Sequence, residues 1–154
     1  MIEPADKYEE QLKDLYAVDG DDYYYYNLPL DVVRQRFVST HNGEVIGSID
    51  LLINKAAGAI LEIPVKTLSE KYRYYFAKDY MTFIRYLMQK YRKISFFVLI
   101  GSPVEKTYDR LAKILKWKIV GVMEKQVLNN KGEWNDVKYY EYINPDWRQE
   151  NGTE

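Results

Sequence analysis

The side chains that most often carry covalent or metal chemistry are scarce in this chain of 154 residues. There is no cysteine, which excludes disulfides, thiolate metal sites and a cysteine nucleophile. With His41 as the single histidine, a multi-histidine metal site is impossible and a histidine-based triad is not expected. Asp19, Asp21 and Asp22 lack the glycine and glutamate spacing of an EF-hand. We predict no metal site, and we expect His41, beside an Asn-Gly turn, to be an exposed loop residue.

Phenols, amines and guanidinium groups gather instead in one segment, "SEKYRYYFAKDYMTFIRYLM", Ser69 to Met88. It holds five of the 16 tyrosines and no glycine. Lys71 and Arg73 can bind phosphate through charge and hydrogen bonds. Tyrosines beside cations can also stack on nucleic-acid bases, but a net charge of −1 makes nucleic acid an unexpected partner.

A helix is predicted for this segment because its apolar residues recur every three or four positions. Its stripe is made of Tyr72, Phe76, Tyr80, Phe83, Ile84, Leu87, Met88 and Tyr91. We interpret the stripe as core. Tyr74, Tyr75 and Tyr86 lie off it, and they are candidates for contact with a protein partner or a second copy of the chain.

The elements before this helix are predicted to be a short helix over residues 5–16 and three antiparallel strands. Alternation and β-branched residues place the strands at Val32–Thr40, Glu44–Ile53 and Ala59–Val65, with a tight turn at Asn42-Gly43 between the first two. The four tyrosines Tyr23–Tyr26 precede the first strand and are interpreted as packing, a partner contact, or one wall of a binding site.

After the aromatic helix comes "SFFVLI", Ser95–Ile100, an apolar run without alternation. Such a run is typical of a strand covered on both faces and parallel to a neighbour. We expect it to be interior, parallel to Ala59–Val65, with the two strands splayed apart at one end.

A second long helix is predicted to begin at "GSPVE", with Ser102 as N-cap, Pro103 in the first turn and Glu105 closing a capping box. It should bury Val104, Tyr108, Leu111 and Leu115 and end near Trp117. The strands "KIVGVMEKQVL" and "WNDVKYYEYI" then form a hairpin. We predict one α/β (α+β) domain over residues 1–143, with a mixed sheet, and a loose polar tail over residues 144–154.

This order of elements resembles the GNAT fold, that of a large superfamily of N-acetyltransferases. "NGEVIGSIDL" is similar to the family's third strand, "dGevvGyi", and "ILEIPVK" stands where its fourth strand does. "LAKILKWKIVGV" is similar to "LYekLGFkivGv", and "KGEWNDVKYYEY" resembles the last strand. The resemblance covers residues 5–143.

The resemblance implies a V-shaped gap between the fourth and fifth strands, in which acetyl-coenzyme A lies with its pantetheine arm along the sheet. The cofactor-binding residues it implies are Val65, Lys71, Arg73 and Tyr74. Glu62, on the fourth strand, stands where the family often carries a carboxylate base, although a solvated surface glutamate is the alternative interpretation. Tyr108 is the candidate acid, one helical turn before the family's usual tyrosine position, which is Ala112 here.

The family's glycine-rich pyrophosphate loop is also replaced, because Tyr74, Phe76 and Lys78 stand where its three glycines align. Glycines let the backbone approach the phosphates, so three larger side chains predict crowding and weak coenzyme A binding.

Two functions remain open from the sequence: an N-acyltransferase using acetyl-coenzyme A on an unknown amine, or a catalytically inactive GNAT-fold structural or interaction protein such as a phage virion component. No signal pattern and no apolar run of ~18 residues is present, so we expect no membrane and a location in the cytoplasm or inside a virion.

Overall fold

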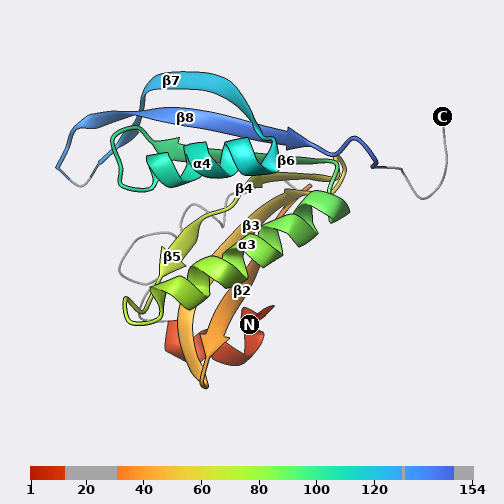
Figure 1. The fold of residues 1–154 in the computed structure, drawn as a ribbon, viewed down its shortest axis with the longest axis vertical. Helices are drawn as coiled ribbons and strands as arrows, with labels where there is room; N and C mark the ends of the chain where they lie inside the picture. Colours follow the sequence, from red (N-terminus) through yellow and green to blue (C-terminus); the bar gives the residue numbers. More distant parts are fainter. Residues whose placement is uncertain (13–30, 130, 148–154) are drawn as a thin grey trace.

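The computed structural model describes residues 1–12, 31–129 and 131–147. Its strands form one eight-stranded sheet in the order β1-β2-β3-β4-β6-β8-β7, with β5 pairing on β3. Two helices, α3 (Arg73–Lys90) and α4 (Glu105–Leu115), pack against the sheet, α3 beside β2 and β3 and α4 beside β6 and β8 (Figure 1). The predicted mixed α/β fold is confirmed. Tyr23–Tyr26 and the aspartates between residues 19 and 22 lie outside the described residues.

The N-terminal part of the sheet is antiparallel. It contains β1 (Ile2–Pro4), which the sequence analysis did not predict, β2 (Val32–His41) and β3 (Glu44–Asn54). Asn42 and Gly43 both have positive φ, as the predicted tight hairpin turn requires. Of the predicted helix over residues 5–16, the described part is the short 3₁₀ helix η1 (Ala5–Tyr8), continued by helical residues 9–12.

The predicted strand Ala59–Val65 is two strands in the structure, β4 (Ala59–Glu62) and β5 (Val65–Thr67), and both pair with β3. Pro64 separates β4 from β5, because proline has no N–H to donate to a ladder. The Pro64 carbonyl still accepts from the Asp50 N–H of β3 at 2.9 Å. The chain from β4 to β5 therefore stays beside β3, and this path shapes the candidate site.

Strand β6 (Lys93–Leu99) is interior, between β4 and β8 (Trp134–Ile143), as predicted. It pairs parallel with β4 at Ala59 and Ile60 and antiparallel with β8 along its full length. Along β6, buried residues alternate with half-buried ones, so the cover expected on both faces is complete on one face and partial on the other.

The aromatic stripe of α3 forms the centre of the core, as predicted. Phe76, Tyr80, Phe83, Ile84 and Leu87 are buried, whereas the off-stripe residues Tyr74, Tyr75 and Tyr86 are exposed. His41 differs from expectation: it ends β2, and its ring stacks on Tyr75 with 4.0 Å between the centroids.

The start of α4 corrects the capping prediction. The helix begins at Glu105 with Val104 as N-cap, and the Ser102 hydroxyl caps nothing. Val104, predicted to be buried, is 45% exposed. The Glu105 carboxylate does reach back, but it accepts from the Gly101 N–H at 2.9 Å.

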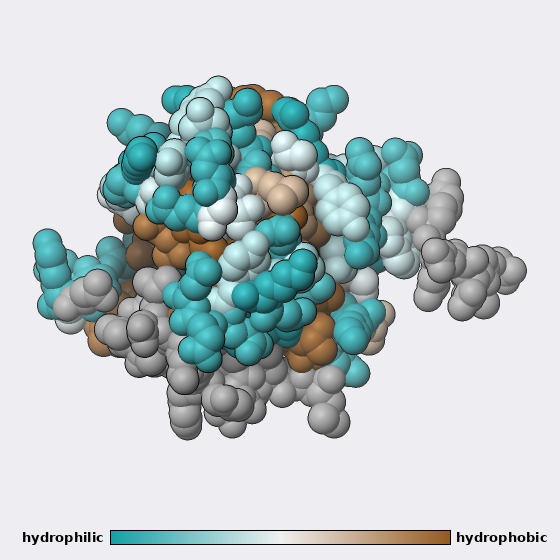
Figure 2. All heavy atoms as spheres, turned by 90° about the horizontal axis from the view of Figure 1, so that it is seen from below, coloured by the Kyte–Doolittle hydropathy of each residue, from teal (hydrophilic) through white to brown (hydrophobic). Residues whose placement is uncertain are grey.

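The C-terminal hairpin joins β7 (Lys118–Leu128) to β8 through a turn in which Gly132 has positive φ. The first residues of the predicted tail contact the domain, because Asn144 donates to the carbonyls of Gln89 and Arg92. Seen from below, the molecule presents mainly hydrophilic side chains with hydrophobic ones showing between them (Figure 2). No helix of the described ranges is both long and apolar enough to cross a bilayer.

Candidate functional site

The candidate site lies where β4 and β6 part. The two strands are paired only at Ala59–Lys93 and Ile60–Ile94. Beyond these residues the chain from Glu62 to Thr67 stays beside β3, while β6 stays beside β8. Each strand therefore presents a backbone edge to the gap with no ladder partner among the described residues. The splaying expected from the sequence is confirmed.

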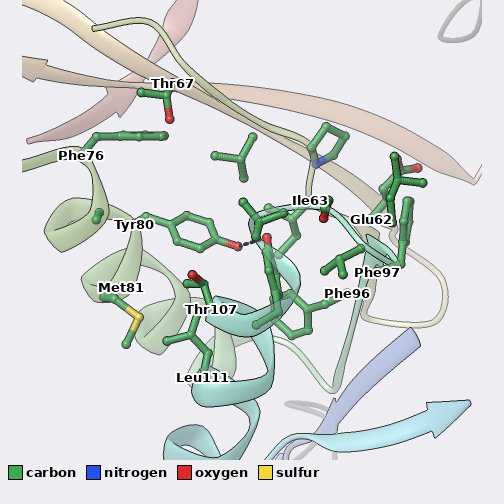
Figure 3. A pocket seen from close by; sticks show the side chains of 18 of the residues that line it. Glu62, Ile63, Thr67, Phe76, Tyr80, Met81, Phe96, Phe97, Thr107 and Leu111 are labelled. Atoms are coloured by element: carbon green, nitrogen blue, oxygen red, sulfur yellow. Dashed lines mark hydrogen bonds between the residues drawn. The ribbon is translucent and has the colours of Figure 1, made fainter. Parts of the chain in front are cut away.

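A cavity of about 690 Å³ fills this gap, which is within the usual size of small-molecule sites. One wall comes from β4 and β5, the other from β6, and the two helices close the space (Figure 3). The lining is mostly apolar and includes Ile63, Val65, Phe76, Met81, Phe96, Phe97 and Leu111. Its polar side chains are few: Glu62, Thr67, Arg73, Tyr80, Ser102, Thr107 and Tyr108.

Two of these polar groups, from different helices, form a pair inside the cavity. The hydroxyls of Tyr80 on α3 and Tyr108 on α4 are 3.1 Å apart, and Figure 3 draws this bond as a dashed line. Tyr80 is only 9% exposed, and no other acceptor for its hydroxyl is recorded in the described ranges. We infer that Tyr80 donates to Tyr108, which leaves the Tyr108 proton available to a ligand.

Both phenols are neutral at physiological pH. Burial raises the pKa of Tyr80 well above its ordinary value, and the nearby Tyr108 adds to the rise. Burial also raises the pKa of Tyr108, partly offset by the hydrogen bond from Tyr80. Tyr108 is thus a proton donor at neutral pH, the form that a general acid needs.

Glu62 reaches the cavity because of a β-bulge. Leu52 pairs with Glu62 and Ile53 with Ile60, so Leu61 is an extra residue in β4. Simple alternation would put Leu61 and Ile63 on one face and Glu62 on the other. Instead Leu61 is 41% exposed, while Glu62 and Ile63 both line the cavity. The bulge thus brings a carboxylate into the site.

At the head of α3, the residues predicted to bind a cofactor separate into two groups. Arg73 lines the cavity, with Glu70 as an ion-pair partner at 3.8 Å. Tyr74 is 69% exposed and, like Lys71, does not line it. The Lys71 amine lies 4.9 Å from the Tyr72 ring centre. Val65, the remaining predicted cofactor residue, forms part of the wall.

The bulky residues that replace the family's glycines point in different directions. Tyr74 and Lys78 are exposed, and the Lys78 amine lies 5.6 Å from the Tyr74 ring centre, outside the cavity. Phe76 packs on Gly47 of β3, where an added Cβ would come within 2.4 Å of its ring. Of the three, only Phe76 lines the cavity, so the crowding expected from the sequence is smaller than three large side chains suggest.

The backbone at the head of α3 offers hydrogen-bond donors. The N–H groups of Arg73 and Phe76 donate to the carbonyls of Glu70 and Tyr72. Those of Tyr74 and Tyr75 have no backbone acceptor recorded among the described residues, as is usual for the first turn of a helix. Together with Arg73, they provide a place where an anionic group would be stabilised.

A charged cluster fixes α4 against β8. Lys138 bridges Glu105 and Asp109, with its amine 2.8 Å and 3.0 Å from their carboxylates. The buried Tyr140 donates to Asp109 at 2.5 Å. The bond from Tyr140, followed by that from Lys138, lowers the pKa of Asp109. This cluster holds the helix that carries Tyr108.

Sequence reasoning missed Tyr80 and Ser102 as site residues. Tyr80 lies on the apolar stripe, where core packing is the ordinary interpretation, and Ser102 was assigned to a helix cap. Only the convergence of α3 and α4 on the gap shows that both side chains line the cavity. The described residues hold no group of three or more His, Asp or Glu side chains that could bind a metal ion.

Comparison with known proteins is informative at the level of structure alone. No family model and no curated protein matches the sequence. The spermidine N-acetyltransferase of Vibrio cholerae in complex with CoA and spermine superposes with a TM-score of 0.60 at 19% identity, covering 88% of this chain and 75% of that one. A Chromobacterium violaceum protein assigned to the GNAT family of acetyltransferases gives 0.64 at 13% identity, covering 83% and 67%. This chain has the GNAT fold.

The gap between β4 and β6 is the feature of the GNAT fold that the sequence resemblance implied. That resemblance was based on the order of elements and on short sequence phrases, whereas the bulge at Leu61 was found only in the structure. The replaced glycines and Ala112 remain departures from the family pattern within that fold, and Ala112 is buried in the core.

Proposed function

We propose that this protein is an N-acyltransferase that moves an acetyl group from acetyl-coenzyme A to an amine. The observation that carries the proposal is the cavity between the parted strands of a GNAT fold, with the Tyr108 hydroxyl inside it. A structural neighbour, the Vibrio cholerae enzyme, has been solved with CoA in place, which supports the choice of cofactor.

The residues around the cavity fit such a cofactor. An apolar lining beside two unpaired strand edges suits a pantetheine arm, which has amides to pair and methylenes to bury. Ser102 supplies an independent indication. Its hydroxyl is buried in the cavity lining without a hydrogen-bond partner, a costly arrangement unless a ligand or water supplies one. The first turn of α3 and Arg73 would face the phosphates.

Bound acetyl-coenzyme A supplies a thioester, at which a C–N bond forms with the amine while the C–S bond breaks. The amine must lose a proton and the departing sulfur must gain one. We assign the first proton transfer to Glu62 and the second to Tyr108, since both residues line the cavity. Tyr80 orients Tyr108 by donating to its oxygen.

Calorimetric titration with acetyl-coenzyme A tests the proposal. Because Tyr74 and Lys78 lie outside the cavity, we expect saturable binding with Kd below ~1 mM. Arg73→Ala should weaken binding by ~10-fold or more, since hydrogen bonds to charged groups are worth ~1.5–3 kcal/mol. Arg85→Ala is the matched control: it lies exposed on the same helix, away from the cavity, and should bind as wild type does.

Catalysis is tested by thiol release from acetyl-coenzyme A with a panel of primary amines and polyamines. Tyr108→Phe should lower kcat by ~10²-fold or more while acetyl-coenzyme A still binds, because only the proton donor is lost. Absence of binding at 1 mM acetyl-coenzyme A would overturn the proposal and favour an inactive interaction module. Binding without transfer to any amine would restrict it to a cofactor-binding protein.

A further inference from the structure

The cavity is lined by residues from both faces of the sheet. Along β6, Phe96 and Val98 are buried in the core beneath the two helices. Phe97 and Leu99 alternate with them, so they point to the opposite face, where they are half-buried and lie outside that core. All four residues line the cavity. The cavity therefore passes through the sheet at the gap between β4 and β6.

Glu62 belongs to the face opposite the helices. It pairs with Leu52 across the ladder, and directly paired residues point to the same face. The neighbours of Leu52 along β3, Leu51 and Ile53, are both in the core beneath the helices, so Leu52 points away from that core. Glu62 therefore points away from it too. In Figure 3 Glu62 lies at the same end of the cavity as Phe97.

Strand β7 also contributes to this end of the cavity, through Val127. Val127 pairs with Asn135 of β8, and Tyr139 of the same strand pairs with Phe97. Asn135 and Tyr139 are four residues apart in β8, so by alternation they point to the same face. The Phe97 and Tyr139 rings pack together, with 5.4 Å between their centroids. Val127, Phe97 and Leu99 thus line the cavity from the face opposite the helices.

The two sides of the cavity differ in chemistry. The helix side holds the paired hydroxyls of Tyr80 and Tyr108 and, at the head of α3, the cation of Arg73. The proposed function places the cofactor on that side, with its phosphates near Arg73, so the opposite side is left for the amine. There the lining combines three apolar side chains with Glu62, the only carboxylate that the described residues contribute to the cavity.

This combination suits an amine with a single positive charge. The Glu62 carboxylate can pair with an ammonium group, and an aromatic ring such as that of Phe97 also attracts a cation. The apolar side chains can bury the carbon atoms of the same molecule, which is favourable in proportion to the area removed from water. A second ammonium group would be removed from water with no further carboxylate among the described residues, which is costly.

We propose that the acceptor is a primary amine with one positive charge and an apolar body, alkyl or aromatic, bound from the face opposite the helices. Glu62 receives the ammonium group, and Phe97, Leu99 and Val127 contact the apolar body. Val127 is then a residue that determines specificity, because it places an apolar side chain where a second charge would need a partner. This assignment rests on the proposed function, whose acetyl transfer it leaves unchanged.

The preference is measured with two amines of equal length, n-pentylamine and putrescine, which differ only in a terminal methyl or amino group. With acetyl-coenzyme A as the other substrate, kcat/KM should be at least ~10-fold higher for n-pentylamine, because the second charge of putrescine lacks a partner. Calorimetric titration of both amines into the protein saturated with coenzyme A gives the same comparison without turnover, and n-pentylamine should bind more tightly.

Val127→Glu should shift the preference, because it adds a second carboxylate to the acceptor end of the cavity. The ratio of kcat/KM for putrescine to that for n-pentylamine should rise ~10-fold or more. Val122→Glu is the matched control: it adds the same charge to the same strand, and Val122 is exposed and does not line the cavity. This control should leave the ratio as it is in the wild type.

Phe97→Ala tests the apolar wall. It should raise KM for n-pentylamine ~10-fold while kcat changes little, because an apolar contact with the acceptor is made equally in the ground state and the transition state. The affinity for acetyl-coenzyme A should stay as in the wild type, since the cofactor is assigned to the helix side. The same titration shows that the variant is folded.

Transfer to putrescine at least as efficient as transfer to n-pentylamine would overturn the inference and leave the proposed function standing. Equal ratios in Val127→Glu and Val122→Glu would do the same. If acetyl-coenzyme A binds but neither amine is acetylated, the calorimetric comparison decides: tighter binding of n-pentylamine supports the inference, and equal or weaker binding overturns it. Failure of acetyl-coenzyme A to bind would overturn the proposed function and, with it, this assignment of the acceptor.

Discussion

Strands β3 and β7 both have eleven residues, and each carries glycine within a mostly apolar stretch, "VIGSI" in one and "IVGVM" in the other. β3 is buried at eight successive positions, whereas β7 has no buried residue. The difference lies in their neighbours: β3 is held between β2 and β4–β5 and faces α3, and β7 stands at the edge.

The two glycines show the same contrast. A Cβ on Gly47 would come within 2.4 Å of the Phe76 ring, while a Cβ on Gly121 would meet nothing within 4 Å. The glycine of β3 is therefore required by close packing against α3. Similar local sequences therefore form a buried strand in one place and an exposed edge strand in another. The predictions below test how strongly this difference in burial affects stability.

The largest effect is expected from replacing the same residue type in both strands. Leu51→Ala in β3 should lower the free energy of unfolding by ~2–5 kcal/mol, because Leu51 is 1% exposed and its loss leaves a cavity. Leu128→Ala in β7 should cost less than ~0.5 kcal/mol, because Leu128 is 53% exposed. Urea unfolding at equal slope measures both values, and equal losses would abolish the contrast.

A smaller effect is expected from Gly47→Ala. The added methyl group should destabilise the protein by ~1–3 kcal/mol, because the Phe76 ring is 4% exposed and enclosed by the core. Phe76→Leu is the partner variant. If the contact is the cause, the double variant should lose less than the sum of the two single losses in a double-mutant cycle. Additive losses would show that Gly47 is needed for another reason.

The smallest effect on stability is expected from Ser102→Ala, at the boundary between the gap and α4. Capping would have made this change cost ~1 kcal/mol. Since the buried hydroxyl has no partner, we expect no loss of stability in thermal or urea unfolding, and a gain of up to ~1 kcal/mol from removing an unpaired polar group. The same variant should weaken the binding of acetyl-coenzyme A if Ser102 contacts the ligand. A clear loss of stability would indicate that the cap exists after all.

Much of the fold could be predicted from the sequence because it follows from local patterns. The apolar stripe of α3 has the helical period, the run "SFFVLI" is the interior strand β6, and the Asn42-Gly43 turn joins β2 to β3. Helical spacing correctly separated the buried rings from Tyr74, Tyr75 and Tyr86. These features depend on neighbours within a few residues, which a sequence records directly.

The site was decided by tertiary structure. Glu62 reaches the cavity because a bulge at Leu61 breaks the alternation, Tyr80 and Tyr108 meet because two helices converge on the gap, and Ser102 lies in the cavity wall instead of capping a helix. The residues of β3 and β7 are similar in type, so the sequence did not reveal that β3 is buried and β7 is exposed. Each of these outcomes depends on which distant segment lies beside a residue, and the periodicity of one strand or helix does not encode that partner.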